Sequence, residues 1–191
     1  YSLQSRGLGD VYKRQDQSSR SAAVLSAKYA PELKGCPEID RLDRNEKAII
    51  TALFTLETFA ASWPERLLER HTVRLAQILD VTPPDWSYGP GQIRLSRATA
   101  TRDSMQPSEI AALLLSTCTS VPFAQKLLSD ISPTLTTSQE PLLPQADILA
   151  IARAYNGSVG RQTNEGALST AVYQQLTYDL VMANYYATNA R

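Results

Sequence analysis

Apolar residues recur at helical spacing along most of this chain. The clearest stripe is formed by Ile49, Ile50, Leu53, Leu56 and Ala60. Asp43 and Glu46 precede this stripe with the spacing of a capping box, in which a side chain accepts a hydrogen bond from the third helical residue. We therefore expect a helix that begins after Asp43 and ends near the Ser62-Trp63-Pro64 segment.

A second helix is expected to run from Pro64, a favoured first-turn residue, to about Leu79. We expect its large apolar side chains to face the core, and they are Leu67, Leu68, Leu75, Ile78 and Leu79. The solvated face is then formed by its charged residues, which are Glu65, Arg66, Glu69, Arg70 and Arg74. His71 lies beside the apolar stripe and is interpreted as a packed or interface residue.

The rest of the chain is also predicted to be mainly helical, with two connections. Residues 80–95 carry several prolines and glycines and predict a loop, and residues 132–144 predict a second connection. Helices are expected at 21–29, 107–117, 121–129, 146–155 and 167–186. The helix at 146–155 is expected to end on Asn156-Gly157 as a C-cap. We find no strand alternation, so the pattern predicts an all-α fold of about six to eight helices with little or no β structure.

The composition limits the function classes. The chain has 191 residues, with 19 basic and 19 acidic side chains, one His and two Cys. Balanced charge is untypical of a nucleic-acid binder, and the apolar runs are too short for a membrane span. One His and two Cys do not suffice for a His-rich catalytic zinc site or a four-ligand zinc finger without carboxylates. We expect no metal, no cofactor, no nucleic acid and no membrane span.

The amino-terminal segment is interpreted separately. Residues 1–15 resemble a translated sequencing-adaptor read-through, and we treat them as a non-native leader; the other interpretation is a genuine polar tail. Without them the chain has 16 basic and 18 acidic residues, a net charge of −2 over 176 residues. The expected organisation is a leader at 1–15, an extension at 16–42 and one domain at 43–191.

Cys36 and Cys118 are 82 positions apart. They are able to form a disulfide in an oxidising compartment, and two separate buried thiols remain the alternative.

Three features carry candidate chemistry. Glu57 falls on the apolar side of the first predicted helix, where desolvation would raise its pKa and suit it to donate a proton. The alternative is a Glu at the edge of the stripe, paired with an Arg or reaching solvent.

The second feature is a Gly-rich segment whose candidate binding residues are Ser87, Tyr88, Gly91 and Gln92. The third is Tyr155 with Asn156. A plain turn and a helix C-cap are the alternatives for these two.

The ordered set of Glu57, Gly89-Pro90-Gly91-Gln92-Ile93 and Ala154-Tyr155-Asn156 resembles the lysozyme-like lytic transglycosylase superfamily. The resemblance covers roughly residues 43–186. It departs from the family where Pro90 and Gly91 replace the usual Leu and Met. Thirty-two residues separate Glu57 from Gly89, which matches branches that carry an inserted helix there.

The resemblance implies a lysozyme-like helical domain that cleaves the bond between N-acetylmuramic acid and N-acetylglucosamine in peptidoglycan. Glu57 would be the general acid and base, and Tyr155 would orient it or the sugar. Ser87 and Gln92 would hydrogen-bond the glycan or brace the Glu. Asp85 is the candidate second carboxylate if the enzyme is a hydrolase. The expected location is the periplasm or the cell exterior.

Two further interpretations remain open. One is a non-catalytic module of the same fold that binds glycan or a protein partner, and the other is an all-α regulator. A catalytic Glu57 should face an open groove near Gln92 and Tyr155, whereas a structural one should be closed over or locked against an Arg. The sequence leaves the choice between water and the muramyl hydroxyl as acceptor open, and also the oligomeric state.

Overall fold

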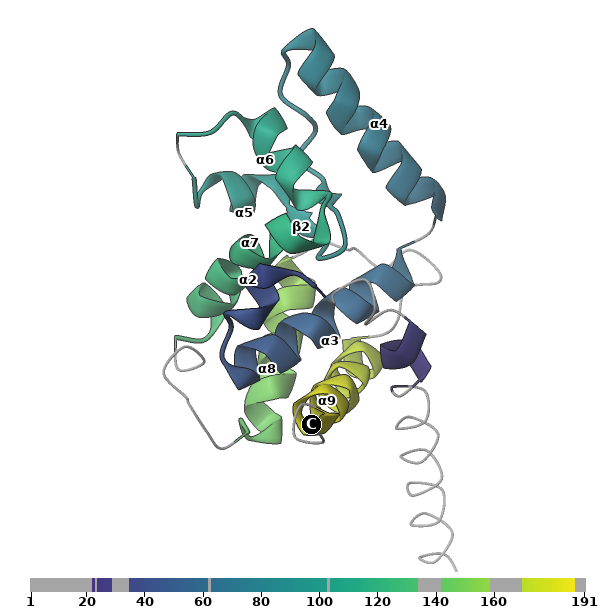
Figure 1. Cartoon of the computed structure of the whole chain (residues 1–191), viewed down its shortest axis with the longest axis vertical. Coiled ribbons are helices and arrows are strands. Elements are labelled where there is room, and N and C mark those ends of the chain that lie inside the picture. Colours follow the sequence, from purple (N-terminus) through teal and green to yellow (C-terminus); the bar gives the residue numbers. More distant parts are fainter. Residues whose placement is uncertain are drawn as a thin grey trace, which may run out of the picture.

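The computed structural model shows an all-α fold with one very small sheet (Figure 1). It describes residues 22, 24–28, 35–61, 63–102, 104–133, 142–158 and 170–187. The expected leader at 1–15 lies outside these residues. The predicted all-α class is confirmed.

The first predicted helix is confirmed together with its cap. α3 spans Arg44–Ala60, and the Asp43 carboxylate accepts a hydrogen bond from the Glu46 backbone N–H at 2.9 Å. The Glu46 carboxylate accepts one in return from the Asp43 N–H at 3.2 Å. This reciprocal pair satisfies two of the N–H groups that a helix start leaves without partners.

α3 forms the centre of the core. It packs against α9 (Thr170–Ala187), which in turn packs against α8 (Gln145–Ser158), as Figure 1 shows for the blue, yellow and light green helices. α7 (Thr117–Ile131) contacts α3 and α8, and the short α2 (Pro37–Asp40) lies on α7. Arg44 links the start of α3 to α9. Its guanidinium donates a hydrogen bond to the Tyr185 carbonyl at 3.0 Å and lies 3.7 Å from the centre of the Tyr185 ring.

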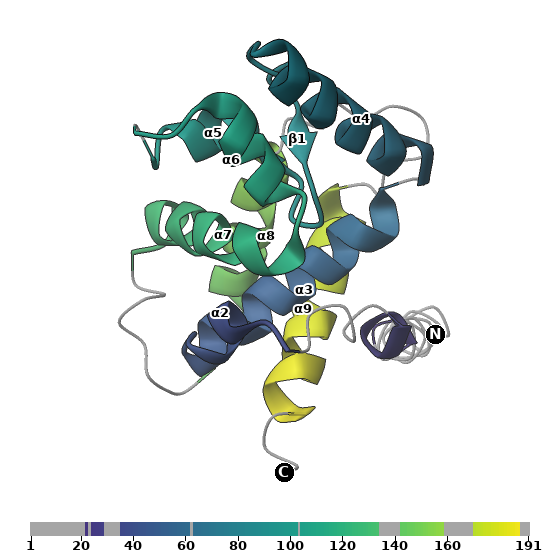
Figure 2. The same cartoon turned by 45° about the horizontal axis from the view of Figure 1, so that its top comes forward.

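A second group of elements lies at the other end of the molecule (Figure 2). It comprises α4 (Trp63–Leu79), α5 (Leu95–Thr99), α6 (Pro107–Leu114), and an antiparallel hairpin of β1 (Ser87–Tyr88) and β2 (Ile93–Arg94). α6 packs against α4, α5 and α7, so it connects the two ends. The predicted loop at 80–95 therefore contains a hairpin, which we did not expect because strands of two residues are too short to show alternation.

The predicted orientation of α4 is wrong. The residues that it buries are Glu69, Val73 and Ala76, which fall within an arc of about 60° at 100° per residue. The large apolar residues predicted to face the core are 45–68% exposed, and they are Leu67, Leu68, Leu75, Ile78 and Leu79. His71 is also exposed. The pattern identified the apolar sector correctly, but periodicity does not say what that sector faces.

A second expectation is also wrong. α8 continues to Ser158, so Asn156 and Gly157 lie inside its last turn and do not cap it. No single helix in the described part of the chain is long and apolar enough to cross a membrane, and α6 with α7 meets that test only as a pair bent by 106°.

Cys36 and Cys118 form a disulfide, which settles the alternative left open above. The bond joins the residue before α2 to the first turn of α7 and closes a loop of 82 positions. Disulfides persist mainly in oxidising compartments, so this bond favours one for the folded chain.

Removing this disulfide should destabilise the domain. A cross-link across a long loop restricts the unfolded chain, and such bonds typically contribute about 2–4 kcal/mol. We expect the double variant Cys36→Ala, Cys118→Ala to lower the free energy of unfolding by about that amount in urea denaturation. Dithiothreitol should destabilise the unaltered chain similarly and leave the double variant unchanged. Equal stability of all samples would show that the bond does not form.

Candidate functional site

Glu57 lies in the last turn of α3, and its side chain is only 1% exposed. The Tyr173 hydroxyl on α9 donates a hydrogen bond to its carboxylate at 2.8 Å. This contact fixes the orientation of a carboxyl group that is shielded from bulk water.

Tyr155 connects Glu57 to the Gly-rich segment. Its ring is fully buried, and its hydroxyl donates to the Gly91 carbonyl at 2.6 Å. Burial and then the negative charge of Glu57 raise the pKa of Tyr155 well above the usual value of a phenol. The structure thus brings together Glu57, Gly91 and Tyr155, three residues from the three features that the sequence singled out.

The turn of the hairpin fits between two helices because it carries no side chains at its points of closest approach. A Cβ on Gly89 would lie 1.7 Å from the Leu114 carbonyl oxygen at the end of α6, and a Cβ on Gly91 would lie 2.6 Å from the ring of Phe54 on α3. Gly89 also has a φ of +70°, which L side chains rarely adopt.

Glu69 is a buried carboxylate that sequence reasoning assigned to the solvated face. It is 7% exposed and accepts hydrogen bonds from the Gly89 N–H at 2.9 Å and the Gln92 side-chain amide at 2.8 Å. Burial raises its pKa, and the hydrogen bonds from Gln92 and Gly89 and the charge of Arg66 offset part of that rise. Gln92 was expected to bind glycan or to brace Glu57. In the structure its side-chain amide donates a hydrogen bond to Glu69.

Gln92 has a backbone conformation that is unusual for a residue with a side chain. Its φ is +48°, in the left-handed region, which costs about 1–2 kcal/mol outside glycine. Its amide compensates by donating to the Gly89 carbonyl at 3.0 Å as well as to Glu69. The turn is thus held in a strained form by specific contacts, a situation that is common at functional sites.

The other predicted binding residues lie around this turn. Tyr88 is fully buried and donates to the Pro84 carbonyl at 2.9 Å; burial, then Glu69 and Asp85, raise its pKa to about 12. Its ring therefore does not face solvent, whereas Trp86 is 44% exposed. Ser87 pairs with Arg94 across the hairpin, and Asn156 is half-buried on α8.

Asp85 has partners of its own. One carboxylate oxygen accepts from the Ser96 N–H at 2.8 Å at the start of α5, and the other pairs with Arg94 at 3.1 Å. Both side chains of that pair are about half exposed, so the pair contributes little to stability. These contacts turn the candidate second carboxylate toward α5.

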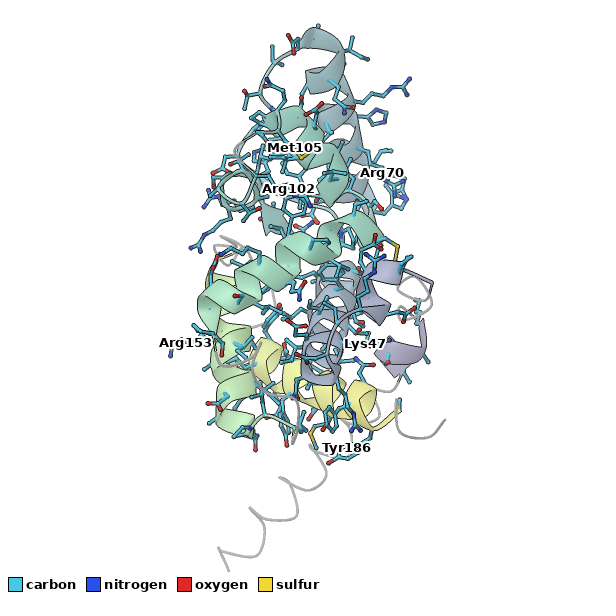
Figure 3. All side chains as sticks on the ribbon, turned by 60° about the vertical axis from the view of Figure 1, so that its left-hand side comes forward. Lys47, Arg70, Arg102, Met105, Arg153 and Tyr186 are labelled. Atoms are coloured by element: carbon cyan, nitrogen blue, oxygen red, sulfur yellow. A yellow bond between two sulfur atoms is a disulfide. The ribbon has the colours of Figure 1, made fainter. Side chains whose placement is uncertain are left out.

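Two hollows adjoin this region. One of about 520 Å³ lies between α5 and the start of α6, where Figure 3 labels Arg102 and Met105. The other, of about 220 Å³, lies between α5 and α7 beside Ile93. Among the described residues, neither of these two hollows is lined by Glu57 or Tyr155.

Sequence reasoning missed Glu69 and Tyr173. Glu69 shares the inner side of α4 with Val73 and Ala76, which are small or branched. The largest apolar residues of the helix point outward. Tyr173 is a buried residue of α9. No spacing in the sequence indicates its hydrogen bond to a residue 116 positions away.

Comparison with known proteins identifies no family for this chain. None of the protein-family models, curated proteins and solved structures compared with the chain matches it. Membership of the lysozyme-like superfamily therefore stays a prediction.

Adding a methyl group at Gly89 should be far more costly than at another glycine with positive φ. Gly35 has a φ of +88° and open space around a Cβ, so Gly35→Ala reports the backbone strain alone. That strain is about 1–2 kcal/mol. Gly89→Ala adds a clash with backbone and should cost at least about 2 kcal/mol more in urea unfolding. Equal effects of the two variants would mean that the turn does not lie against Leu114.

The raised pKa of Glu69 predicts a pH dependence of stability. A carboxyl group with a raised pKa in the folded state contributes fully below the unfolded value of about 4.5, and that contribution declines as pH rises through the folded value. The difference in unfolding free energy between the unaltered chain and Glu69→Met should therefore narrow from pH 4 to pH 8. Gln77→Met, which replaces an exposed residue of the same helix that does not titrate, should show no comparable trend. A difference that widens with pH would contradict the assignment.

Proposed function

We propose that this chain cleaves the glycan strands of peptidoglycan, with Glu57 as the general acid and base. One observation carries the proposal: Glu57, the Gly89–Ile93 turn and Tyr155 converge, through the Tyr155–Gly91 hydrogen bond and the electrostatic effect of Glu57 on Tyr155. These are the three features whose order along the chain resembles the lysozyme-like lytic transglycosylases. A titratable residue close to a turn with strained backbone is a candidate for an active site.

The proposed reaction begins with proton transfer from Glu57 to the glycosidic oxygen that links N-acetylmuramic acid to N-acetylglucosamine. The bond from that oxygen to the muramyl carbon then breaks, and the resulting carboxylate accepts the proton of the attacking hydroxyl group. If the muramyl 6-hydroxyl attacks, the product is a 1,6-anhydro sugar; if water attacks, it is a reducing end. Positioned proton transfer of this kind contributes about 10²–10⁴-fold to a rate.

The surroundings of Glu57 suit such an acid in two respects. Its carboxyl group is buried in the last turn of α3, out of contact with bulk water. Tyr173 then has a role that our sequence analysis did not include, since its hydroxyl fixes the orientation of the carboxyl group and stabilises the carboxylate left after proton transfer. Asp85 is left outside this scheme by its contacts with α5.

Glu57 should be essential for turnover. We expect Glu57→Gln to slow the turbidity clearing of purified peptidoglycan by about 100-fold or more, because an amide is not acidic enough to transfer a proton to the glycosidic oxygen. Glu65→Gln, on the exposed side of α4, is the matched control and should clear at the original rate. Far-ultraviolet circular dichroism and a thermal melt establish that both variants fold. Clearing by folded Glu57→Gln at the control rate would reject the proposal.

The burial of Glu57 favours a second candidate. A side chain that is 1% exposed does not reach a glycosidic oxygen until part of its surroundings moves. The alternative is therefore a non-catalytic module that binds glycan or a protein partner on the same fold. In that case the unaltered chain should co-sediment with peptidoglycan sacculi, release no soluble fragments, and lose no binding when Glu57 becomes Gln.

A further inference from the structure

The outward face of α4 is apolar over most of its length. At 100° per residue, five large side chains share a sector of about 120° with His71, on the side opposite Glu69. We call this sector the outer α4 face; it comprises Leu67, Leu68, Leu75, Ile78 and Leu79, which are 45–68% exposed. Trp63 at the start of the helix and Val81 just after it are exposed as well. Contiguous apolar surface of this kind usually marks an interaction site.

One edge of this face is basic. Arg70 and Arg74 lie about 60° and 20° beyond Leu67 at 100° per residue, and they therefore line that edge. Arg70 and Arg74 are exposed, and Figure 3 labels Arg70 on α4. Glu69 does not offset their charge at the surface, because its carboxylate points inward to Gly89 and Gln92. We call this row the arginine edge.

We infer that the outer α4 face binds the surface of an anionic lipid bilayer. An interfacial helix places an apolar sector at the boundary between headgroups and acyl chains and its cationic residues among the headgroups. Here the outer α4 face supplies the apolar sector, and the arginine edge supplies the cationic residues. Trp63 lies at the start of the helix, and tryptophan is a residue favoured at membrane interfaces.

The position of α4 allows this contact. In Figures 1 and 2 the helix forms the outer margin of the molecule, and its inner side rests on α6 and the hairpin. A flat surface is therefore able to approach the outer α4 face without displacing another described element. The inference does not depend on glycan cleavage, since neither Glu57 nor Tyr155 belongs to this face.

Charge complementarity favours a bilayer over a second copy of the chain. Two α4 helices packed antiparallel about a two-fold axis set the same edge of each helix together, so the two arginine edges would repel. Anionic headgroups instead offer negative charge along the whole edge. Self-association is nevertheless an outcome that the experiment must distinguish.

The test is sedimentation of the full chain with large vesicles. One set contains phosphatidylcholine and phosphatidylglycerol in equal amounts, and the other contains phosphatidylcholine alone. We expect the partition coefficient to be at least about tenfold higher on the anionic vesicles and to fall with added salt. Two double variants should each reduce it by about tenfold or more: Leu75→Asp with Ile78→Asp, and Arg70→Glu with Arg74→Glu.

Matched controls carry the same chemistry elsewhere on the surface. Val24→Asp removes an exposed apolar residue, and Arg153→Glu reverses an exposed charge on α8, which Figure 3 places away from Arg70. Both should bind like the unaltered chain. Circular dichroism verifies that every variant is folded.

Three results would overturn the inference. The first is no binding to either vesicle, and the second is anionic-vesicle binding that survives both double variants. The third is a dimer in analytical ultracentrifugation that Leu75→Asp with Ile78→Asp dissociates, in a chain that does not bind vesicles. That last result would assign the outer α4 face to a second copy.

Discussion

The two hydrogen bonds that Glu69 accepts hold the turn of the hairpin, and the rest of the candidate site depends on that turn. The Gly89–Gln92 segment contains two residues with positive φ and lies against helices that a single methyl group would strike. Such a turn needs specific contacts to persist. Glu69 supplies them from α4, and Tyr155 supplies another from α8. The turn consequently links α4, α8 and the Phe54 side of α3.

From this turn the contacts lead to the buried acid. Tyr155 lies on Gly91 and within the electrostatic influence of Glu57, and Tyr173 reaches Glu57 from α9. Burial suits a carboxyl group that must hold its proton, but it also keeps substrate away. Catalysis by Glu57 therefore requires a movement that exposes it. The unusual division of α4, with a carboxylate inside and leucines outside, follows from the same turn, because Glu69 has to face it.

Local signals predicted the fold well. The Asp43 and Glu46 capping box and the apolar stripe behind it depend on residues a few positions apart, so the sequence defines the start of α3. The orientation of α4 depends on what surrounds it. Its leucines form the stronger apolar stripe, yet Glu69 determines the inner side because it has partners on the hairpin. The hairpin itself was missed because paired strands of two residues leave no pattern.

The site was predictable only in part. Glu57 and Tyr155 were singled out from their positions in an ordered set of motifs, and the structure brings them near each other. Their partners were not predictable, because Tyr173 contacts Glu57 across 116 positions and Glu69 contacts Gln92 across 23. Such pairs are set by how helices pack, which local patterns in a single sequence do not reveal. Tyr88 shows the converse, since a residue expected to bind substrate is fully buried.

The measurement that tests the central claim most directly is mass spectrometry of the soluble products that the full chain releases from purified peptidoglycan. Our account predicts disaccharide-containing muropeptides that end in a 1,6-anhydro sugar or in a free reducing end, depending on the acceptor. Release of peptides without cleaved glycan bonds, or of no soluble products at all, would contradict the assignment of Glu57 as a glycosidic acid.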